Sequence, residues 1–212
     1  MARPAGARNH DFEEKRAALL DALTEYALSS DLRRPSLRQF AIAAGASEPT
    51  LRHYFTDRQG LVGAILENIN LRGQALWSAI STPAADPAKA VEEYLRVSEA
   101  GMRHGGFSRA HAFGLIEGLA DPVAAEAYRE MLLEPALRAV MDKIANTPGA
   151  PKGEPAQRAL ALAMFSPLLV ISLHQDLLGG AEASPFDTSE LIDHLRTWLS
   201  AGASDTERQP VA

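Results

Sequence analysis

Residues 45–61, GASEPTLRHYFTDRQGL, contain the pattern that decides the fold. Ser47 is a residue type that caps helix N-termini, and Pro49 falls in the first turn, where its missing N–H would have had no intrahelical partner. Leu51 and Phe55 are four residues apart and therefore share one helix face. The stretch predicts a short helix that turns this apolar face to a core and leaves its other side chains on the surface.

The residues before this helix predict a second short helix over 37–44, capped by Ser36 and closed by Gly45 in the left-handed conformation. Ala41 is small enough for two helices to cross closely, and Leu51 lies where it packs back on the preceding helix. This spacing is typical of a helix-turn-helix. After Phe55, Thr56 or Asp57 can cap a longer helix.

The polar groups of this region suit the major groove of DNA. Thr50 can bond a base edge or offer its methyl group to thymine, while Arg52 and His53 can donate to base acceptors. The alternatives are that Tyr54 packs over the third helix, that Arg58 is a solvated charge at a helix start, and that His53 is a solvent-facing residue without a contact. The candidate DNA-binding residues are Ser36, Arg38, Ser47, Glu48, Pro49, Thr50, Arg52, His53, Tyr54 and Arg58.

Charge is distributed unevenly along the 212 residues, whose net charge is −6. Residues 1–62 contain nine Lys/Arg and eight Asp/Glu, whereas the remaining residues contain 12 and 19. A surface that faces a polyanion is therefore expected in the first third of the chain. The chain has no cysteine, which excludes disulfides and thiolate metal sites. We expect a cytoplasmic protein with no membrane span, because the most apolar stretch, residues 159–173, is too short for one.

Beyond residue 58 the periodicity indicates only helices, over 58–80, 88–102, 108–119, 123–145, 156–178 and 189–201. The sequence thus predicts an all-α protein of about nine helices. We expect an N-terminal three-helix helix-turn-helix DNA-binding domain at 10–58, fused to a larger helical domain at 59–203.

The stretch LRQFAIAAGASEPTLRHYFTDRQGLVGAIL, residues 37–66, resembles the DNA-binding signature of the tetracycline-repressor (TetR) family of transcriptional regulators. The resemblance spans residues 15–66. It implies that Arg38, Pro49 and Thr50 approach bases, that Ser36, Tyr54 and Arg58 approach phosphates, and that the larger domain binds ligand and dimerises. Two features depart from the family pattern: Glu48 replaces a frequent Lys or Gln, and Arg52 and His53 replace an aromatic pair. Glu48 is repelled by phosphate but can accept from a cytosine amino group.

The last two long helices predict a homodimer. Residues 156–178 are apolar on nearly all sides, which in a water-soluble protein implies burial against the chain's own core and against a partner. Ordinary core packing is the alternative for the last helix, and Pro167 predicts a kink or a break. The expected interface residues are Phe165, Leu168, Leu169, Ser172, Asp176, Leu191, Ile192, Leu195, Trp198 and Leu199.

A ligand pocket is expected among the large apolar residues of the second domain. Glu117 can orient a cationic or hydroxylated ligand there, although a surface or salt-bridged glutamate is the commoner arrangement. His104 and His111 lack the supporting ligands that a metal site needs, so we expect no metal and no cofactor. The candidate pocket residues are Trp77, Tyr94, Met102, Phe107, His111, Phe113, Glu117, Tyr128, Met131 and Phe165.

Together these patterns predict a homodimeric repressor that binds a palindromic double-stranded DNA operator and is released by an unidentified small apolar effector. An enzyme is disfavoured, because the sequence has no phosphate-binding glycine loop, no Gly-x-Ser-x-Gly and no His-Glu-x-x-His. The remaining alternative is a helical adaptor that binds another protein and does not bind DNA.

Overall fold

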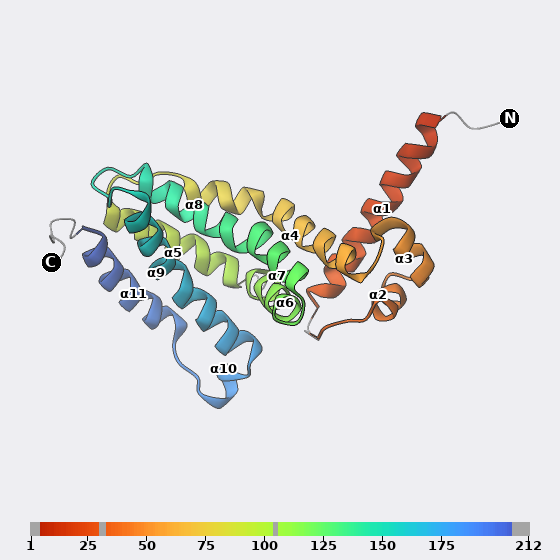
Figure 1. Ribbon diagram of the computed structural model, residues 1–212. Coiled ribbons are helices and arrows are strands. Elements are labelled where there is room, and N and C mark those ends of the chain that lie inside the picture. Colours follow the sequence, from red (N-terminus) through yellow and green to blue (C-terminus); the bar gives the residue numbers. More distant parts are fainter. Residues whose placement is uncertain (1–4, 30–32, 104–105, 205–212) are drawn as a thin grey trace. The chain divides into compact units, whose positions relative to one another are not determined.

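The computed structural model describes residues 5–29, 33–103 and 106–204, and every regular element in this part of the chain is a helix (Figure 1). The all-α prediction is therefore confirmed. The α-helices are α1 (Ala5–Ala27), α2 (Leu37–Ala43), α3 (Glu48–Phe55), α4 (Arg58–Ser81), α5 (Pro87–Arg103), α6 (Gly106–Ala120), α7 (Pro122–Tyr128), α8 (Glu134–Ala145), α9 (Glu154–Ser172), α10 (Gly180–Ala183) and α11 (Thr188–Ser204).

The observed helices differ from the predicted ones in three places. The stretch predicted as one helix at 123–145 contains α7, a π-helical segment at Arg129–Leu133 and α8. A second π-helical segment, Leu173–Leu177, continues α9, and the short α10 was not predicted. Helix α9 runs through Pro167 without a break.

Contacts within the chain divide it into two compact units. The first unit consists of Met1–Arg72 and Ala112–Leu132, and the second of Gly73–His111 and Leu133–Ala212. Helices α4 and α6 each begin in one unit and end in the other. The functional division at 10–58 and 59–203 stays a prediction, since it concerns roles and not compactness.

The first unit is built on helices α1, α2 and α3, with α2 in contact with both of the others. Leu23 of α1, Phe40 of α2 and Leu51 of α3 are completely buried together with the start of α4. The Tyr26 ring meets the Phe40 ring edge-on, with 5.8 Å between centroids. Burying several such side chains contributes about 1.5–3 kcal/mol each, which is enough to hold two very short helices.

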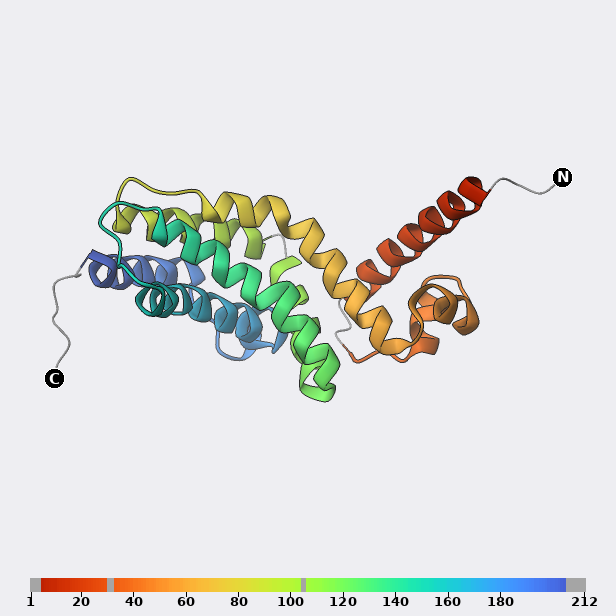
Figure 2. The same cartoon turned by 45° about the horizontal axis from the view of Figure 1, so that its top comes forward.

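In the second unit, α11 packs against α5, and α8 packs against α9 (Figures 1 and 2). Its core includes Leu95, Val140, Met164, Leu168 and Ile192. Among the described residues, one helical stretch, Glu154–Leu177, is long and apolar enough to cross a membrane. The same stretch supplies core residues of this unit, among them Met164 and Leu168.

Candidate functional site

The turn between α2 and α3 is fixed by side-chain caps at both helix starts. The Ser36 Oγ accepts the N–H of Gln39 at 3.3 Å, and the Gln39 Oε1 accepts the N–H of Ser36 at 2.8 Å, which forms a capping box. The Ser47 Oγ accepts the N–H of Thr50 at 3.2 Å. Gly45 has a φ of 61°, the left-handed conformation that the sequence predicted. All three predicted turn residues are confirmed.

A tight turn joins α3 to α4. Thr56 has φ 70° and ψ −61°, and the Asp57 N–H bonds the Phe55 carbonyl at 2.8 Å, which are the features of a strained γ-turn. Asp57 then caps α4 by accepting the N–H of Gly60 at 2.8 Å. A Cβ on Gly60 would lie 2.2 Å from the Phe55 carbonyl oxygen, so only glycine fits there. The direction of α3 is therefore set by backbone as well as by its buried side chains.

The surface of α3 presents polar groups to solvent. Pro49, Arg52 and His53 are exposed, while Leu51 and Phe55 are buried, as the sequence predicted. Glu48 and Thr50 are half-buried in the first turn. On the preceding helix Arg38 is exposed. Within the described residues neither Arg38 nor Arg52 forms an ion pair, so both guanidinium groups can meet an anionic partner.

An aromatic cluster supports one side of α3. The Tyr54 ring lies 4.8 Å from the ring of Phe12 on α1, and the His53 ring meets Phe12 edge-on at 5.5 Å. Arg16, one turn further along α1, places its guanidinium 5.3 Å from the centre of the Phe55 ring. Phe12 is therefore a supporting residue of the candidate site. Phe12 was not predicted as a site residue, because nothing local in the sequence indicates that its ring meets Tyr54 and His53.

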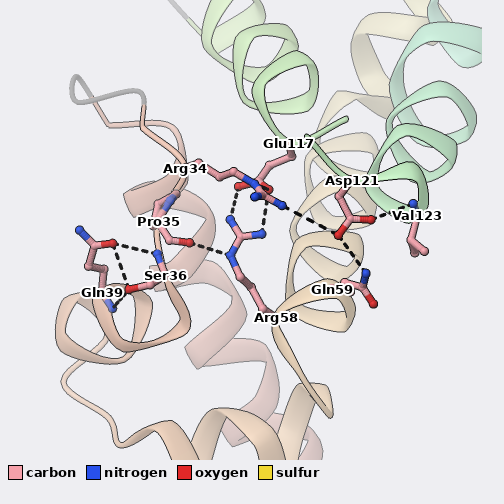
Figure 3. A network of polar contacts seen from close by, with 9 residues as sticks. All are labelled: Arg34, Pro35, Ser36, Gln39, Arg58, Gln59, Glu117, Asp121 and Val123. Carbon is pink, nitrogen blue, oxygen red and sulfur yellow. Dashed lines mark hydrogen bonds and ion pairs between the residues drawn. The ribbon is translucent and has the colours of Figure 1, made fainter. Parts of the chain in front are cut away.

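Arg58 forms a buried ion pair, which contradicts its expected role as a phosphate contact. Its Nη1 and Nη2 donate to the two carboxylate oxygens of Glu117 at 2.9 and 2.5 Å, and its Nε donates to the Pro35 carbonyl at 2.8 Å (Figure 3). Glu117 is completely buried. Because all three guanidinium nitrogens are used within the protein, Arg58 joins the start of α4 to α6 and to the segment before α2.

The same network corrects the expectation that Glu117 faces a ligand pocket. The Arg34 Nε donates to Glu117 at 3.2 Å, and Asp121 lies 3.9 Å from Arg34 (Figure 3). Asp121 also caps α7 and accepts from Gln59 at 2.9 Å. The hydrogen bond from Gln59, with those from the start of α7, holds the pKa of Asp121 below its usual value. The salt-bridged glutamate that the sequence left open is the arrangement found.

A small apolar cavity lies in the second unit. Its free space is about 10 Å³, which is room for about one water molecule. Four predicted pocket residues contribute to its wall, namely Trp77, Tyr94, Phe107 and Phe165. The other lining residues are Leu76, Ile80, Ser98, Gly101, Ala136 and Val140. The wall contains no charged side chain, so any molecule that enters it must be largely apolar and uncharged.

His111 is buried beside this cavity. Its ring lies 4.5 Å from the Phe107 ring and 5.5 Å from the Phe165 ring, measured between centroids. Burial lowers the pKa of His111 to about 4, because the charged form cannot be hydrated there. The imidazole is therefore neutral at physiological pH, which fits an apolar neighbourhood.

Other residues expected in the pocket lie elsewhere. Phe113, Tyr128 and Met131 belong to the first unit, as Glu117 does, and none of them lines the cavity. Tyr128 instead packs on Gly114, where a Cβ would lie 2.1 Å from its ring. Burial raises the pKa of Tyr128. The side chain of Met102 lies outside the described part of the chain, as does His104, and no group of three metal-ligating side chains occurs among the described residues.

The predicted interface residues differ in burial: some are buried, some half-buried and some exposed. Phe165, Leu168, Ser172, Ile192 and Leu195 are buried inside the second unit itself and are not available to face a partner, which corrects the prediction for these five. Leu169, Leu191 and Leu199 are half-buried, while Asp176 and Trp198 are exposed. Asp176 accepts from Ser108 Oγ at 3.0 Å. Apolar side chains that remain exposed nearby are Leu162 and Val170 on α9 and Leu178 just after the second π-helical segment.

No family model and no curated protein matches the chain in sequence. Solved structures do match it in fold. A transcriptional regulator from Rhodococcus sp. Rha1 matches with a TM-score of 0.63 at 20% identity, over 89% of this chain and 95% of that one. A putative TetR-family transcriptional regulator from Mesorhizobium loti matches with a TM-score of 0.64 at 20% identity, over 90% and 95% of the two chains. A further putative TetR-family regulator, from Rhodococcus sp., gives 0.64 at 17% identity, over 91% and 100%. The chain therefore has the fold of the TetR-family transcriptional regulators.

Proposed function

We propose that this chain is a DNA-binding transcriptional regulator and that α3 reads bases in the major groove. The observation that carries the proposal is the divided surface of α3: Leu51 and Phe55 fix it to the core, while Pro49, Arg52 and His53 face solvent. The major groove is about 12 Å wide and accepts one α-helix. The fold shared with transcriptional regulators supports the same conclusion.

Binding to DNA is tested by fluorescence anisotropy with duplexes from the region upstream of the gene and with shuffled duplexes of the same composition. We expect affinity for one upstream site to exceed that for shuffled DNA by about 1,000-fold or more. The logarithm of the binding constant should fall linearly with the logarithm of salt concentration, because phosphate contacts release counterions. Equal affinity for upstream and shuffled DNA would contradict the proposal and leave the adaptor alternative.

Point variants separate a DNA-reading surface from a general charge effect. Replacing Arg38 and Thr50 by alanine should abolish specific binding, since the resemblance places both at base-contacting positions and Arg38 forms no ion pair among the described residues. Arg138→Ala on α8 removes an exposed guanidinium from the second unit and serves as the matched control. We expect the control to bind as the unchanged protein does.

We also propose that the chain is a homodimer, joined through the exposed apolar side chains of α9 and α11. Leu162, Val170 and Trp198 are 41%, 63% and 62% exposed in the single chain. A two-fold dimer places its reading helices about 34–36 Å apart, or a multiple of that, which requires a palindromic operator. In sedimentation, Val170→Glu should yield monomers. Val123→Glu, which changes a comparably exposed valine on α7, should leave the dimer intact; monomers from both variants or from neither would contradict this interface.

Finally, we propose that a small, uncharged, apolar molecule releases the protein from DNA, as in a cytoplasmic repressor. The cavity of about 10 Å³ is far smaller than the roughly 300–1,000 Å³ of typical ligand sites, so an effector has to displace its lining side chains. Trp198→Phe leaves Trp77 as the single tryptophan, on the cavity wall. An effector should change the emission of Trp77 and weaken operator binding together. Release without a change at Trp77 would place the effector site elsewhere.

A further inference from the structure

We infer that Glu48 makes the operator require a cytosine in each half-site. This inference rests on the proposed function, since it takes α3 to lie in the major groove. Glu48 is the first residue of α3 and is half-buried. Within the described residues its carboxylate has no hydrogen bond and no ion pair. Arg52 stands one turn further along the helix, at a spacing where ion pairs commonly form, yet the two side chains do not pair.

The neighbouring polar groups in this turn already bond one another. The Ser47 Oγ accepts the N–H of Thr50 and lies 2.8 Å from the Thr50 Oγ1, so the two hydroxyl groups are also joined. Pro49 has no N–H and holds its backbone at a fixed φ. The first turn of α3 is therefore rigid, and Glu48 supplies its one anionic side chain, which forms no hydrogen bond among the described residues.

A carboxylate can only accept hydrogen bonds, which restricts the bases it can face. In the major groove, guanine presents acceptors at O6 and N7 and thymine presents an acceptor at O4, so both repel it. Cytosine presents its N4 amino donor, and adenine its N6 amino donor. Adenine places the N7 acceptor beside that donor, where it opposes the second carboxylate oxygen. Cytosine has only a C–H at the corresponding position and is therefore preferred.

Two other roles for Glu48 make different predictions. A phosphate contact is excluded by like charge. Interaction of an acidic side chain with the N-terminal end of the helix dipole is favourable, and it affects how stable α3 is. That interaction does not depend on the base sequence of the DNA. A change in base preference therefore distinguishes base recognition by Glu48 from a role in stabilising α3 alone.

The inference is tested by selecting binding sites from a random duplex library with the unchanged protein, Glu48→Ala and Glu48→Gln. We expect the sites selected by the unchanged protein to share a cytosine at one position of each half-site, which we call the cytosine column. Sites selected by Glu48→Ala should lack that column. Glu48→Gln should convert the column to adenine, because an amide donates to N7 and accepts from N6. Glu67→Gln changes an exposed glutamate of α4 and should return the original motif.

Anisotropy on single duplexes then measures the size of the effect. Replacing the selected C·G pair should lower the affinity of the unchanged protein for the duplex by about 5-fold to 150-fold. The same replacement should lower the affinity of Glu48→Ala by less than about 2-fold. Melting curves of all four proteins show whether each is folded, and Glu48→Gln keeps the size of the side chain if Glu48→Ala proves unstable.

The failures of the two proposals are distinguishable. A clear motif that is the same for the unchanged protein, Glu48→Ala and Glu48→Gln overturns the role of Glu48 and leaves specific DNA binding intact. A column that responds to Glu48 but holds guanine, thymine or adenine in the unchanged protein also overturns it. If no protein enriches any motif, the proposed function itself fails.

Discussion

Removing Glu117 should destabilise the first unit strongly, because it leaves a guanidinium without its counterion. Glu117 is completely buried and accepts three hydrogen bonds, at 2.9 and 2.5 Å from Arg58 and at 3.2 Å from Arg34. The Arg58 side chain is 24% exposed, so water replaces the lost acceptors only in part. Breaking a buried pair on one side costs about 3–5 kcal/mol, and we expect a cost in this range for Glu117→Leu.

Replacing both partners should cost much less than replacing one. Arg58→Met with Glu117→Leu removes both charges and fills their space with apolar atoms, and such exchanges are commonly neutral or stabilising. Arg34 is 42% exposed and keeps Asp121 as a neighbour, so its charge still has water and an acidic partner in the double variant. We expect the double variant to be within about 1 kcal/mol of the unchanged protein, and therefore at least about 2 kcal/mol more stable than Glu117→Leu alone.

The assay is urea unfolding followed by circular dichroism, at one protein concentration throughout, since association would shift the midpoint. Glu92→Gln is the control, because its ion pair with Lys89 is largely exposed and should contribute nothing measurable to the midpoint. The reasoning is refuted if Glu117→Leu lies within about 1 kcal/mol of the unchanged protein. It is refuted equally if the double variant is no more stable than Glu117→Leu alone.

Three further perturbations test other parts of the structure. Gly60→Ala should destabilise by about 1–3 kcal/mol, because its Cβ would meet the Phe55 carbonyl, whereas Gly63→Ala has free space and should be neutral or stabilising in the same urea assay. Since the pKa of His111 is about 4 in the folded chain and 6.5 for a histidine exposed to water, the unfolded state binds the extra proton as pH falls between these values. Stability should therefore drop by up to about 3 kcal/mol from pH 6.5 to pH 4, and less in His111→Phe, as measured by unfolding at each pH. Phe12→Ala should weaken operator binding in anisotropy while retaining the dimer in sedimentation, because Tyr54 and His53 lose the ring they pack on.

The short helices of the first unit were predictable because their signals are local. Ser36, Gly45 and Ser47 act on backbone groups within three residues of themselves, so their roles follow from chain geometry alone. The capping box also includes Gln39, and its Ser-x-x-Gln pattern is present in the sequence at residues 36–39. Leu51 and Phe55 are fixed by helical period. These features do not depend on how distant parts of the chain come together.

Arg58 and Glu117 could not be paired from sequence, since 59 residues separate them. Each residue taken alone has an ordinary interpretation: a basic residue at the start of a helix next to a DNA-reading turn, and an acidic residue on an apolar helix. Only the meeting of α6 with the start of α4 in the first unit decides that the two charges neutralise each other (Figure 3). The same holds for Phe12, because nothing local in the sequence indicates that its ring packs on Tyr54.

Helical period shows that a residue is apolar and on one face, but not whether the chain's own core or a partner chain covers that face. For this reason some of the predicted interface residues of α9 and α11 are buried in the core and others are exposed. Ile192 and Leu195 lie on the stripe that the sequence assigned to a partner, yet the chain's own core buries them. Val170 and Trp198 remain exposed on the same two helices, although their burial would remove apolar surface from water. Apolar surface on these two helices therefore remains exposed to water after the chain's own core has formed. The partner, if it is a second copy, is therefore expected on the face that contains Val170 and Trp198, and not on the stripe that contains Ile192 and Leu195.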